Sequence, residues 1–229
     1  MGKKFQGVVD HYLFVGNPGT GKTTVARIMG NIFYSLGVLP SNRLLEVTRK
    51  DLVEGYVGQT ATKTARVVKR AVGGVFFIDE AYSLMGDNFG QEATNTILPM
   101  LLDYKGKMVC IAAGYPREIR QWIDTNSGLE SRFTKVIHFE DYNPDELAQI
   151  FRMKVKKDKL TLTPEAENAM HVYFTDLYNR RERNFANARE VNNYFDRVKK
   201  NQSSRLRHEM ERPDFDPASY SILLPEDMG

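Results

Sequence analysis

The feature that most constrains the fold is a glycine-rich stretch between a short apolar run and an amphipathic segment. Residues 16–23 read Gly-Asn-Pro-Gly-Thr-Gly-Lys-Thr, which fits the phosphate-loop pattern GxxxxGK[ST] without a mismatch. Glycines let the backbone turn its N–H groups towards a phosphate, and a helix starting near Lys22 would point its positive end at the same anion. A plain glycine-rich turn is the alternative. The flanking strand and helix patterns favour the phosphate site.

A second motif places two carboxylates at the end of an apolar run. Residues 75–78 read Val-Phe-Phe-Ile and are followed by Asp79 and Glu80. A buried strand here would deliver both acids to its C-terminal end, where ligands of open α/β sheets bind. We expect Asp79 to hold Mg²⁺ through water and Glu80 to polarise the attacking water as general base. An acidic pair that only caps a helix is the alternative, which the phosphate loop in the same sheet disfavours.

Short β-like runs alternate with helical stretches up to about Asp141. The strand candidates are nearly all apolar, as expected for parallel strands that are buried on both faces. They are residues 12–15, 44–47, 75–78, 108–112 and 136–139. This alternation predicts an α/β domain over residues 1–141, with a parallel sheet and right-handed crossovers.

The pattern changes to helices alone after residue 141. Residues 143–146, Asn-Pro-Asp-Glu, have the N-cap, proline and acidic first turn of a helix start, and residues 163–165 repeat this signal. Three amphipathic helices follow without a strand-like run between them. We therefore predict a small helical domain over residues 142–200 and a polar tail over residues 201–229.

Composition excludes several classes of protein. The apolar runs of this 229-residue chain are far shorter than the ~20 residues that span a bilayer, and no signal peptide is visible. A net charge of +3 does not argue for a nucleic-acid partner. The single cysteine, Cys110, permits no internal disulfide and reads as a small core residue. We expect a cytoplasmic protein with no membrane or nucleic-acid partner.

The sequence resembles one class of nucleotide hydrolase. The Asn-Lys-x-Asp motif of GTPases and the Leu-Ser-Gly-Gly-Gln motif of ABC ATPases are absent. Instead, the chain resembles the AAA+ ATPases and, among them, the CbxX/CfqX branch, which includes red-type Rubisco activases and stage V sporulation protein K. The segments that carry the resemblance are residues 16–24, 47–53, 56–61, 77–82, 113–115, 128–133 and 185–189. It implies a five-stranded parallel sheet in the AAA+ order with a C-terminal helical lid.

The resemblance also implies ATP and Mg²⁺ as cofactors and assigns residue roles. Arg132 matches the arginine finger that enters the neighbouring subunit's ATP site, where a planar guanidinium can spread charge over the γ-phosphate. Arg189 matches the sensor 2 arginine that tethers the lid to the nucleotide. An ordinary surface arginine and an arginine paired at a helix end are the alternatives. The implied nucleotide-binding residues are Asn17, Pro18, Gly19, Thr20, Gly21, Lys22, Thr23, Thr24 and Arg189, and the implied Mg²⁺ ligands are Thr23 and Asp79.

One further motif matches the family pattern, and two features of the chain differ from that pattern. Tyr56, Val57 and Gly58 match the aromatic–hydrophobic–glycine loop that lines the pore of AAA+ rings, although a buried tyrosine in a β-turn fits these residues equally well. The fourth strand ends in residues 112–115, Ala-Ala-Gly-Tyr, without the asparagine that many members use as sensor 1. Only 15 residues precede Gly16, which leads us to expect a domain excised from a longer protein.

Together these features predict a module that hydrolyses Mg-ATP at subunit interfaces of a homo-oligomer, a hexamer in the complete protein. Its pore loop would engage a protein client, which the sequence does not identify. The rival interpretation is an ATP-binding switch or scaffold that changes partners without threading a client. A DNA-loading ATPase is disfavoured by the near-neutral charge and the aromatic pore loop.

Overall fold

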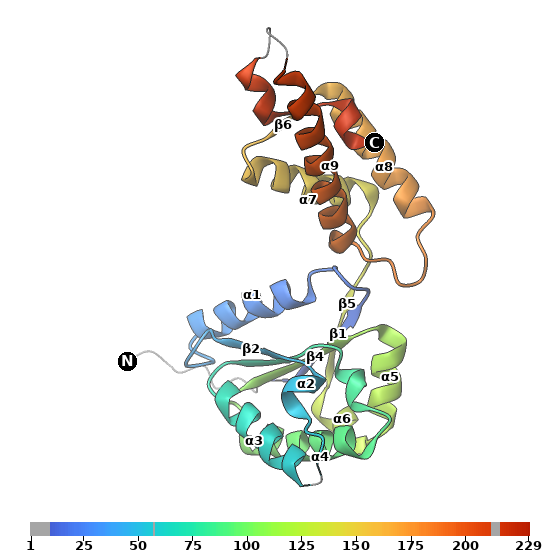
Figure 1. The fold of residues 1–229 in the computed structure, drawn as a ribbon. Helices are drawn as coiled ribbons and strands as arrows, with labels where there is room; N and C mark the ends of the chain where they lie inside the picture. The colour runs from blue at the N-terminus through green and yellow to red at the C-terminus, as the bar shows by residue number, and fades with distance from the viewer. Residues whose placement is uncertain (1–9, 57, 212–215) are drawn as a thin grey trace. The chain divides into compact units, whose positions relative to one another are not determined.

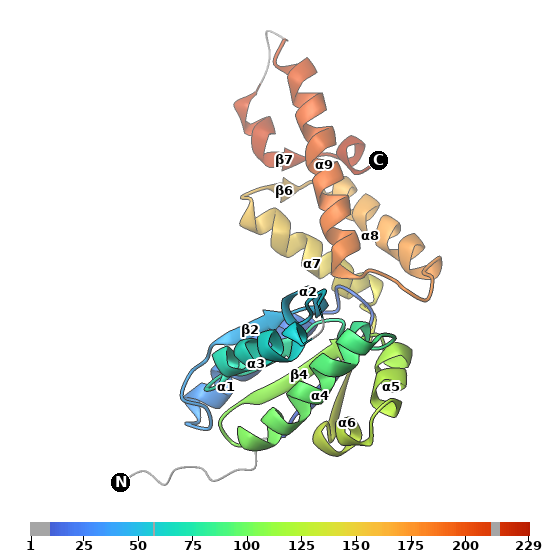
Figure 2. The ribbon, with the colours of Figure 1, turned by 60° about the horizontal axis from the view of Figure 1, so that its bottom comes forward.

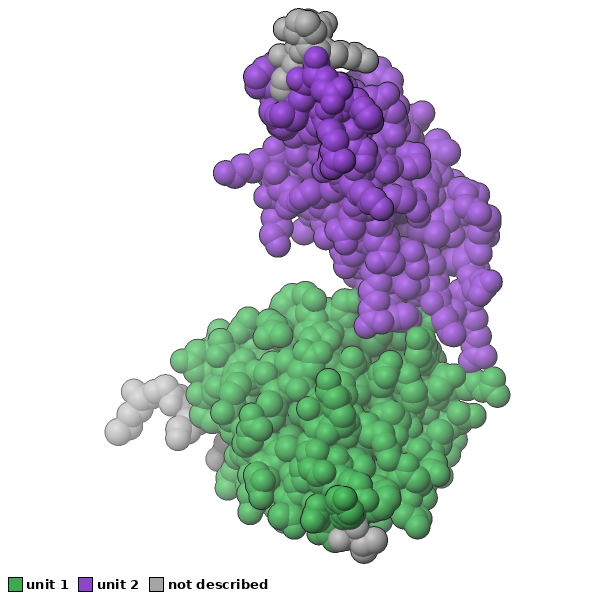
Figure 3. Space-filling view, viewed as in Figure 1, with its two compact units in different colours: residues 1–17, 21–140 green, residues 18–20, 141–229 purple. Residues whose placement is uncertain are grey.

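The computed structural model describes residues 10–56, 58–211 and 216–229. The chain divides into two compact units, which Figure 3 colours separately. Unit 1 comprises residues up to 17 together with residues 21–140, and unit 2 comprises residues 18–20 and 141–229. Among the described residues, no helix is long and apolar enough to cross a membrane.

Unit 1 is built on a five-stranded parallel sheet. Its strands are β1 (Tyr12–Gly16), β2 (Leu44–Val47), β3 (Val75–Ile78), β4 (Val109–Gly114) and β5 (Lys135–Phe139). They lie in the order β2-β3-β4-β1-β5, with every neighbouring pair parallel. Every residue of β3 and β4 is buried, as expected for central strands covered on both faces. The order confirms the fold that the sequence predicted.

Helices cover both faces of this sheet (Figure 1). On one face, α1 packs Ala26 against Phe14 and Phe77. On the other, α3 to α6 bury Val68 and Trp122 against the sheet. The helical elements of unit 1 are α1 (Lys22–Ser35), α2 (Arg49–Leu52), α3 (Gln59–Ala71), η1 (Ala81–Leu84), α4 (Asn88–Asp103), α5 (Pro116–Asp124) and α6 (Ser127–Arg132).

Unit 2 is mainly helical and has its own aromatic core. Its helices are α7 (Pro144–Lys157), α8 (Pro164–Asn179) and α9 (Ala188–Glu209). Asn143 and Glu146 form the predicted capping box of α7. Phe151 meets Phe174 and Tyr194 at ring-centroid distances of 5.9 and 5.4 Å, which joins the three helices. Two short parallel strands, β6 (Thr161–Leu162) and β7 (Ile222–Leu223), pair beside them (Figure 2), where the sequence predicted no strand.

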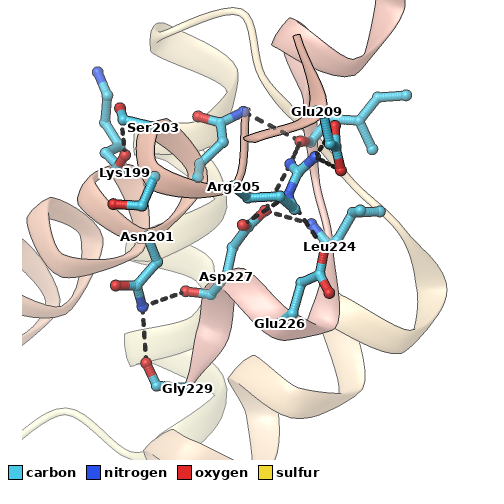
Figure 4. Close-up of polar contacts among 12 residues, drawn as sticks. Lys199, Asn201, Ser203, Arg205, Glu209, Leu224, Glu226, Asp227 and Gly229 are labelled. Atoms are coloured by element: carbon cyan, nitrogen blue, oxygen red, sulfur yellow. Dashed lines mark hydrogen bonds and ion pairs between the residues drawn. The ribbon is translucent and has the colours of Figure 1, made fainter. Parts of the chain in front are cut away.

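The C-terminal residues pack into unit 2, where the sequence analysis expected a polar tail from residue 201. Helix α9 continues to Glu209, and Leu223 and Met228 lie in the helical core. The short helices η2 (Pro217–Ser221) and η3 (Pro225–Met228) complete this segment. Arg205 of α9 donates to both carboxylate oxygens of Asp227 at 2.9 Å and to Glu209 at 3.0 Å (Figure 4). These charge-assisted bonds fix the C-terminal segment on α9.

Candidate nucleotide site

The predicted phosphate loop connects β1 to α1. Gly16, the last residue of β1, has no room for a side chain, because a Cβ would lie 2.3 Å from the Phe139 carbonyl oxygen on β5. Gly21 caps α1 with φ at 90°, a left-handed conformation that favours glycine. Within the described chain, no side chain at the N-cap bonds to the first turn of α1, and this turn carries no acidic residue. The N-terminus of α1 therefore suits an anion.

Lys22 lies over this loop and bonds to its backbone. Its Nζ donates hydrogen bonds to the carbonyl oxygens of Gly16 at 2.9 Å and Asn17 at 2.7 Å. A lysine held in this position puts a positive charge beside the α1 N-terminus, where a polyphosphate would bind. Thr23 follows in the first turn of α1, half-buried, and Thr24 is exposed.

The loop's tip, residues 18–20, is bound to the segment before α9 in unit 2. The side-chain amide of Asn187 donates to the Pro18 carbonyl oxygen at 3.3 Å, and the Ala188 N–H donates to the Gly19 carbonyl oxygen at 3.2 Å. Gly19 has φ at 72°, and a Cβ there would lie 2.2 Å from the Ala186 carbonyl oxygen. The Tyr142 hydroxyl donates to the Thr20 carbonyl oxygen at 3.1 Å. The tip thus requires glycine at position 19 for two reasons, its backbone angle and its close neighbours.

The two predicted carboxylates follow β3 at the carboxyl edge of the sheet. Asp79 is half-buried and its N–H donates to the Val47 carbonyl oxygen at 2.8 Å, which extends the β2–β3 pairing by one residue. The Asp79 carboxylate accepts the Glu80 N–H at 3.1 Å. Glu80 has φ at 51° and an exposed side chain. Because β4 lies between β1 and β3 with all three parallel, the phosphate loop and both carboxylates share one edge.

The donor set fits a magnesium ion that is bound jointly with phosphates. No group of three or more His, Cys, Asp or Glu side chains among the described residues is placed to hold a metal. Thr23 and Asp79 offer a hydroxyl and a carboxylate, which are hard oxygen ligands. Mg²⁺ commonly binds through one or two such side chains, with water and substrate phosphates completing its shell. Thr23 and Asp79 therefore remain the residues that would hold it.

The two predicted arginines differ in exposure. Arg132 ends α6 and is half-buried; its guanidinium donates to the Ser131 hydroxyl, while its Nε is buried without a hydrogen-bond partner among the described residues. Arg189, on α9, is exposed, and its N–H lies 2.9 Å from where a Cβ on Gly19 would be. The backbone of Arg189 therefore lies beside the loop tip. The finger and sensor 2 roles remain predictions.

The predicted pore loop precedes α3. Tyr56 is 74% exposed, so the alternative of a buried tyrosine is wrong. Gly58 has φ at 80° and forms the N-cap of α3. Val57 lies outside the described residues. The loop thus presents an aromatic side chain to solvent two residues before a left-handed glycine.

Sequence reasoning did not single out two residues whose contacts lie near this site. Tyr82 packs against the end of β4, and Asn187 binds the loop tip to the segment before α9. Both stand in segments that carried the family resemblance, but their contacts are with residues far away in the chain. Cys110 is buried in β4, and burial raises the pKa of its thiol, which fits the predicted core role.

Comparisons with known proteins agree with this geometry. Residues 12–141 match the family model described as "ATPase family associated with various cellular activities (AAA)", and residues 143–229 match the AAA lid domain. Solved structures that resemble the chain include the AAA domain of FIGL-1, with a TM-score of 0.66 and 16% identity over 96% of this chain and 69% of that one. At 16% identity, this similarity shows a shared fold only.

Curated relatives are more similar in sequence. The chain is 43% identical to a chloroplastic Rubisco activase of Cyanidioschyzon merolae, over 86% of this chain and 68% of the relative. It is 40% identical to protein CbbX of Cereibacter sphaeroides, over 95% of this chain and 71% of the relative. The ESX-1 secretion system protein EccA1 of Mycobacterium tuberculosis is 46% identical over 68% of this chain and 28% of the relative. The chain is thus a nucleotide-binding AAA ATPase with an AAA lid domain and belongs to the CbbX/CfxQ family, the branch that its sequence resembles.

Proposed function

We propose that this chain is the motor module of a ring-forming remodeller that hydrolyses Mg-ATP and pulls on a protein client. The exposed side chain of Tyr56 carries the proposal, because an aromatic group held in solvent beside a glycine can grip an extended peptide without reading its sequence. The relatives' names mention a Rubisco activase and a secretion system. A protein client is compatible with both names, and we therefore propose one here.

The chemistry follows from the positions of the charged groups. Lys22 and the α1 N-terminus bind the phosphates, while Thr23 and Asp79 would hold Mg²⁺, which neutralises phosphate charge when it is bound. Glu80 is exposed at the sheet edge, where its carboxylate can orient a water molecule and accept its proton. Arg132 of a neighbouring copy stabilises the charge that develops on the γ-phosphate. Such an arrangement requires a homo-oligomer, which we propose to be a hexamer.

Two measurements test the enzymatic part in the full chain. Glu80→Gln should retain ATP and Mg²⁺ while ATP turnover falls by about 100-fold or more, because general-base catalysis contributes about that much. Mass measurement of this variant in solution with ATP and Mg²⁺ should show six copies. Undiminished turnover would remove Glu80 from its role. A monomer under these conditions would remove the ring.

The pore role is tested separately in cells that lack the native copy. Lys22→Ala should abolish the cellular activity, and Tyr56→Ala should abolish it while ATP turnover is retained. Tyr34→Ala is the matched control, since Tyr34 is also an exposed tyrosine, at 52%. If Tyr56→Ala supports full cellular activity while Lys22→Ala does not, the protein is an ATP-binding switch or scaffold and threads no client.

A further inference from the structure

The loop that carries Tyr56 belongs to a segment that is tied together by hydrogen bonds. This segment, which we call the loop arm, comprises residues 48–56 and 58–64 and includes α2 and the first turns of α3. Side chains of α3 donate to backbone carbonyl oxygens that precede the loop: the Lys63 ammonium to Lys50 at 2.9 Å and Val53 at 3.0 Å, and the Thr64 hydroxyl to Leu52 at 2.9 Å. The chain before the loop is thus fixed to the helix after it, so a displacement of α2 reaches the loop.

Arg49, the first residue of α2, joins the loop arm to the segment that follows the catalytic acid. Its guanidinium donates to the Ser83 carbonyl oxygen on η1 at 2.8 Å and to the Asp87 carboxylate at 2.6 Å. The Ser83 N–H in turn donates to the Glu80 carbonyl oxygen at 2.8 Å. A short chain of hydrogen bonds therefore connects the backbone of Glu80 with α2.

The start of α4 is shaped to receive this guanidinium. Asp87 is the N-cap of α4, and its carboxylate also accepts the Gly90 N–H at 2.8 Å. A Cβ on Gly90 would lie 2.7 Å from Nη1 of Arg49 and 2.3 Å from the Leu84 carbonyl oxygen. Glycine at position 90 therefore leaves the space through which Arg49 reaches both acceptors. A guanidinium suits this place, because its planar fork can donate to two groups at once.

The contacts of Arg49 are strong by comparison with another link between the loop arm and α4. In that link the Ala61 N–H donates to the Glu92 carboxylate at 3.3 Å, beyond the usual range for such a bond. The Arg49–Asp87 pair is shorter and has a charge on both sides, which strengthens a hydrogen bond. The Arg49 side chain is 30% exposed, so water only partly screens the pair.

We propose that Arg49 couples the nucleotide site to the Tyr56 loop, by holding the loop arm on the residues that follow Glu80. This inference rests on the proposed function, in which Glu80 acts on ATP and Tyr56 grips the client. Loss of the γ-phosphate changes the charge that the end of β3 faces. A shift of residues 80–83 in response passes through the Ser83 carbonyl group to Arg49 and α2, and so to the loop.

A thiol in the loop reports this coupling without hydrolysis and without a client. Tyr56→Cys places a thiol where the native side chain is exposed, and the native Cys110 is buried, so a maleimide reagent reads position 56. In the full chain, the modification rates with ADP and with a non-hydrolysable ATP analogue and Mg²⁺ should differ about fivefold or more. Adding Arg49→Met should bring the two rates within about twofold, while the analogue still binds. Equal rates before this change, or a difference that survives it, would overturn the inference.

Two further variants separate coupling from a loss of stability. Arg120→Met is the matched control, since Arg120 pairs with Asp124 on the exposed surface of α5, and it should leave the rate difference intact. Asp87→Asn keeps an oxygen that caps Gly90 but removes the charge that faces Arg49. It should reduce the rate difference and leave the melting temperature within about 2 °C. An undiminished difference in Asp87→Asn overturns the inference even if Arg49→Met does not fold.

Failure of this inference is distinguishable from failure of the proposed function. Undiminished ATP turnover in Glu80→Gln, or full cellular activity of Tyr56→Ala, would remove the proposed function, and neither measurement involves Arg49. If those variants behave as proposed while the rate difference at position 56 survives Arg49→Met, only the role of Arg49 is wrong.

Discussion

The side-chain amide of Asn187 donates a hydrogen bond to the Asp141 carboxylate at 2.7 Å, which joins the first residue after the sheet domain to the residue that precedes α9. The same amide donates to the carbonyl oxygens of Pro18 and Phe185, and its oxygen accepts the Tyr142 N–H at 2.8 Å. Asn187 is fully buried and has φ at 51°. One side chain thus forms hydrogen bonds with three separate segments of unit 2.

Asn187→Ala should lower the free energy of unfolding by about 2 kcal/mol or more, because it leaves the Tyr142 N–H without this acceptor and places alanine at a positive φ. Urea unfolding of the full chain measures this change. Asn187→Gly relieves the backbone angle but not the lost bonds, so it should recover only part of the loss. Asn192→Ala, on the exposed face of α9, is the control and should change stability by less than about 0.5 kcal/mol. Equal effects of the Asn187 and Asn192 substitutions would contradict this account.

Two glycines with similar backbone angles allow a matched comparison at the loop tip. Gly19 and Gly37 have φ at 72° and 69°, but of the two only Gly19 has described atoms within 4 Å of the place where a Cβ would lie. Gly37→Ala should therefore lower the unfolding free energy by about 1–2 kcal/mol from the backbone angle alone. Gly19→Ala should lower it by about 3 kcal/mol and weaken ATP binding, because the Ala186 carbonyl oxygen blocks the new methyl group. Similar losses in both variants, measured by urea unfolding and ATP titration, would rule out the steric contribution.

The strands and the phosphate loop are predictable because their signals are local. The expected strands at residues 44–47 and 75–78 coincide with β2 and β3, since each is a short, mostly apolar run. Strand β4 extends to Gly114, two residues beyond the expected end. Its last residues, Ala113 and Gly114, are small and have weak β propensity, so only pairing with β1 reveals that they are in the sheet.

Contacts between distant segments account for what the sequence did not reveal. Leu223 and Met228 stand in a polar segment without periodicity, and only their packing in the helical core shows that residues 217–229 are structured. The same holds for the site. Gly16 to Thr23 and Asp79 form recognisable motifs, whereas the fit of Tyr82 against Gly114 depends on the approach of η1 to β4, which no spacing encodes.

Asp51 predicts a pH dependence of stability. Its carboxylate accepts hydrogen bonds from the Thr48 N–H at 2.8 Å and the Thr48 hydroxyl at 2.9 Å, and the backbone bond is the main cause that lowers the pKa of Asp51. A carboxyl group whose pKa is lowered in the folded state stabilises the protein at pH values above its unfolded-state pKa of about 3.9. This contribution is lost as the pH falls through the lowered pKa. Asp51→Asn should thus be less stable than the native chain at pH 7.

The measurement is the unfolding free energy of both proteins as a function of pH. The difference between them should shrink as the pH falls below about 4, where the native Asp51 becomes protonated. Asp103→Asn, an exposed carboxylate that ends α4, is the control, with an expected change below about 0.5 kcal/mol at pH 7. A stability difference that is constant between about pH 7 and about pH 3 would show that the Thr48 bonds do not favour the ionised form.

The last prediction concerns the ion pair that holds the C-terminal segment. Asp227 is 1% exposed and pairs with Arg205, whose side chain is 10% exposed. Asp227→Ala should lower the unfolding free energy by about 3–5 kcal/mol, because it leaves a buried guanidinium without its closest partner and removes the acceptor of the Leu224 N–H. Glu226→Ala is the matched control: Glu226 lies 3.5 Å from Arg205 but is 64% exposed, so its loss should be below about 1 kcal/mol. If urea unfolding gives equal losses for the two variants, solvent screens the Arg205–Asp227 pair, and other contacts of the C-terminal segment, such as the packing of Leu223 and Met228 in the helical core, hold it in place.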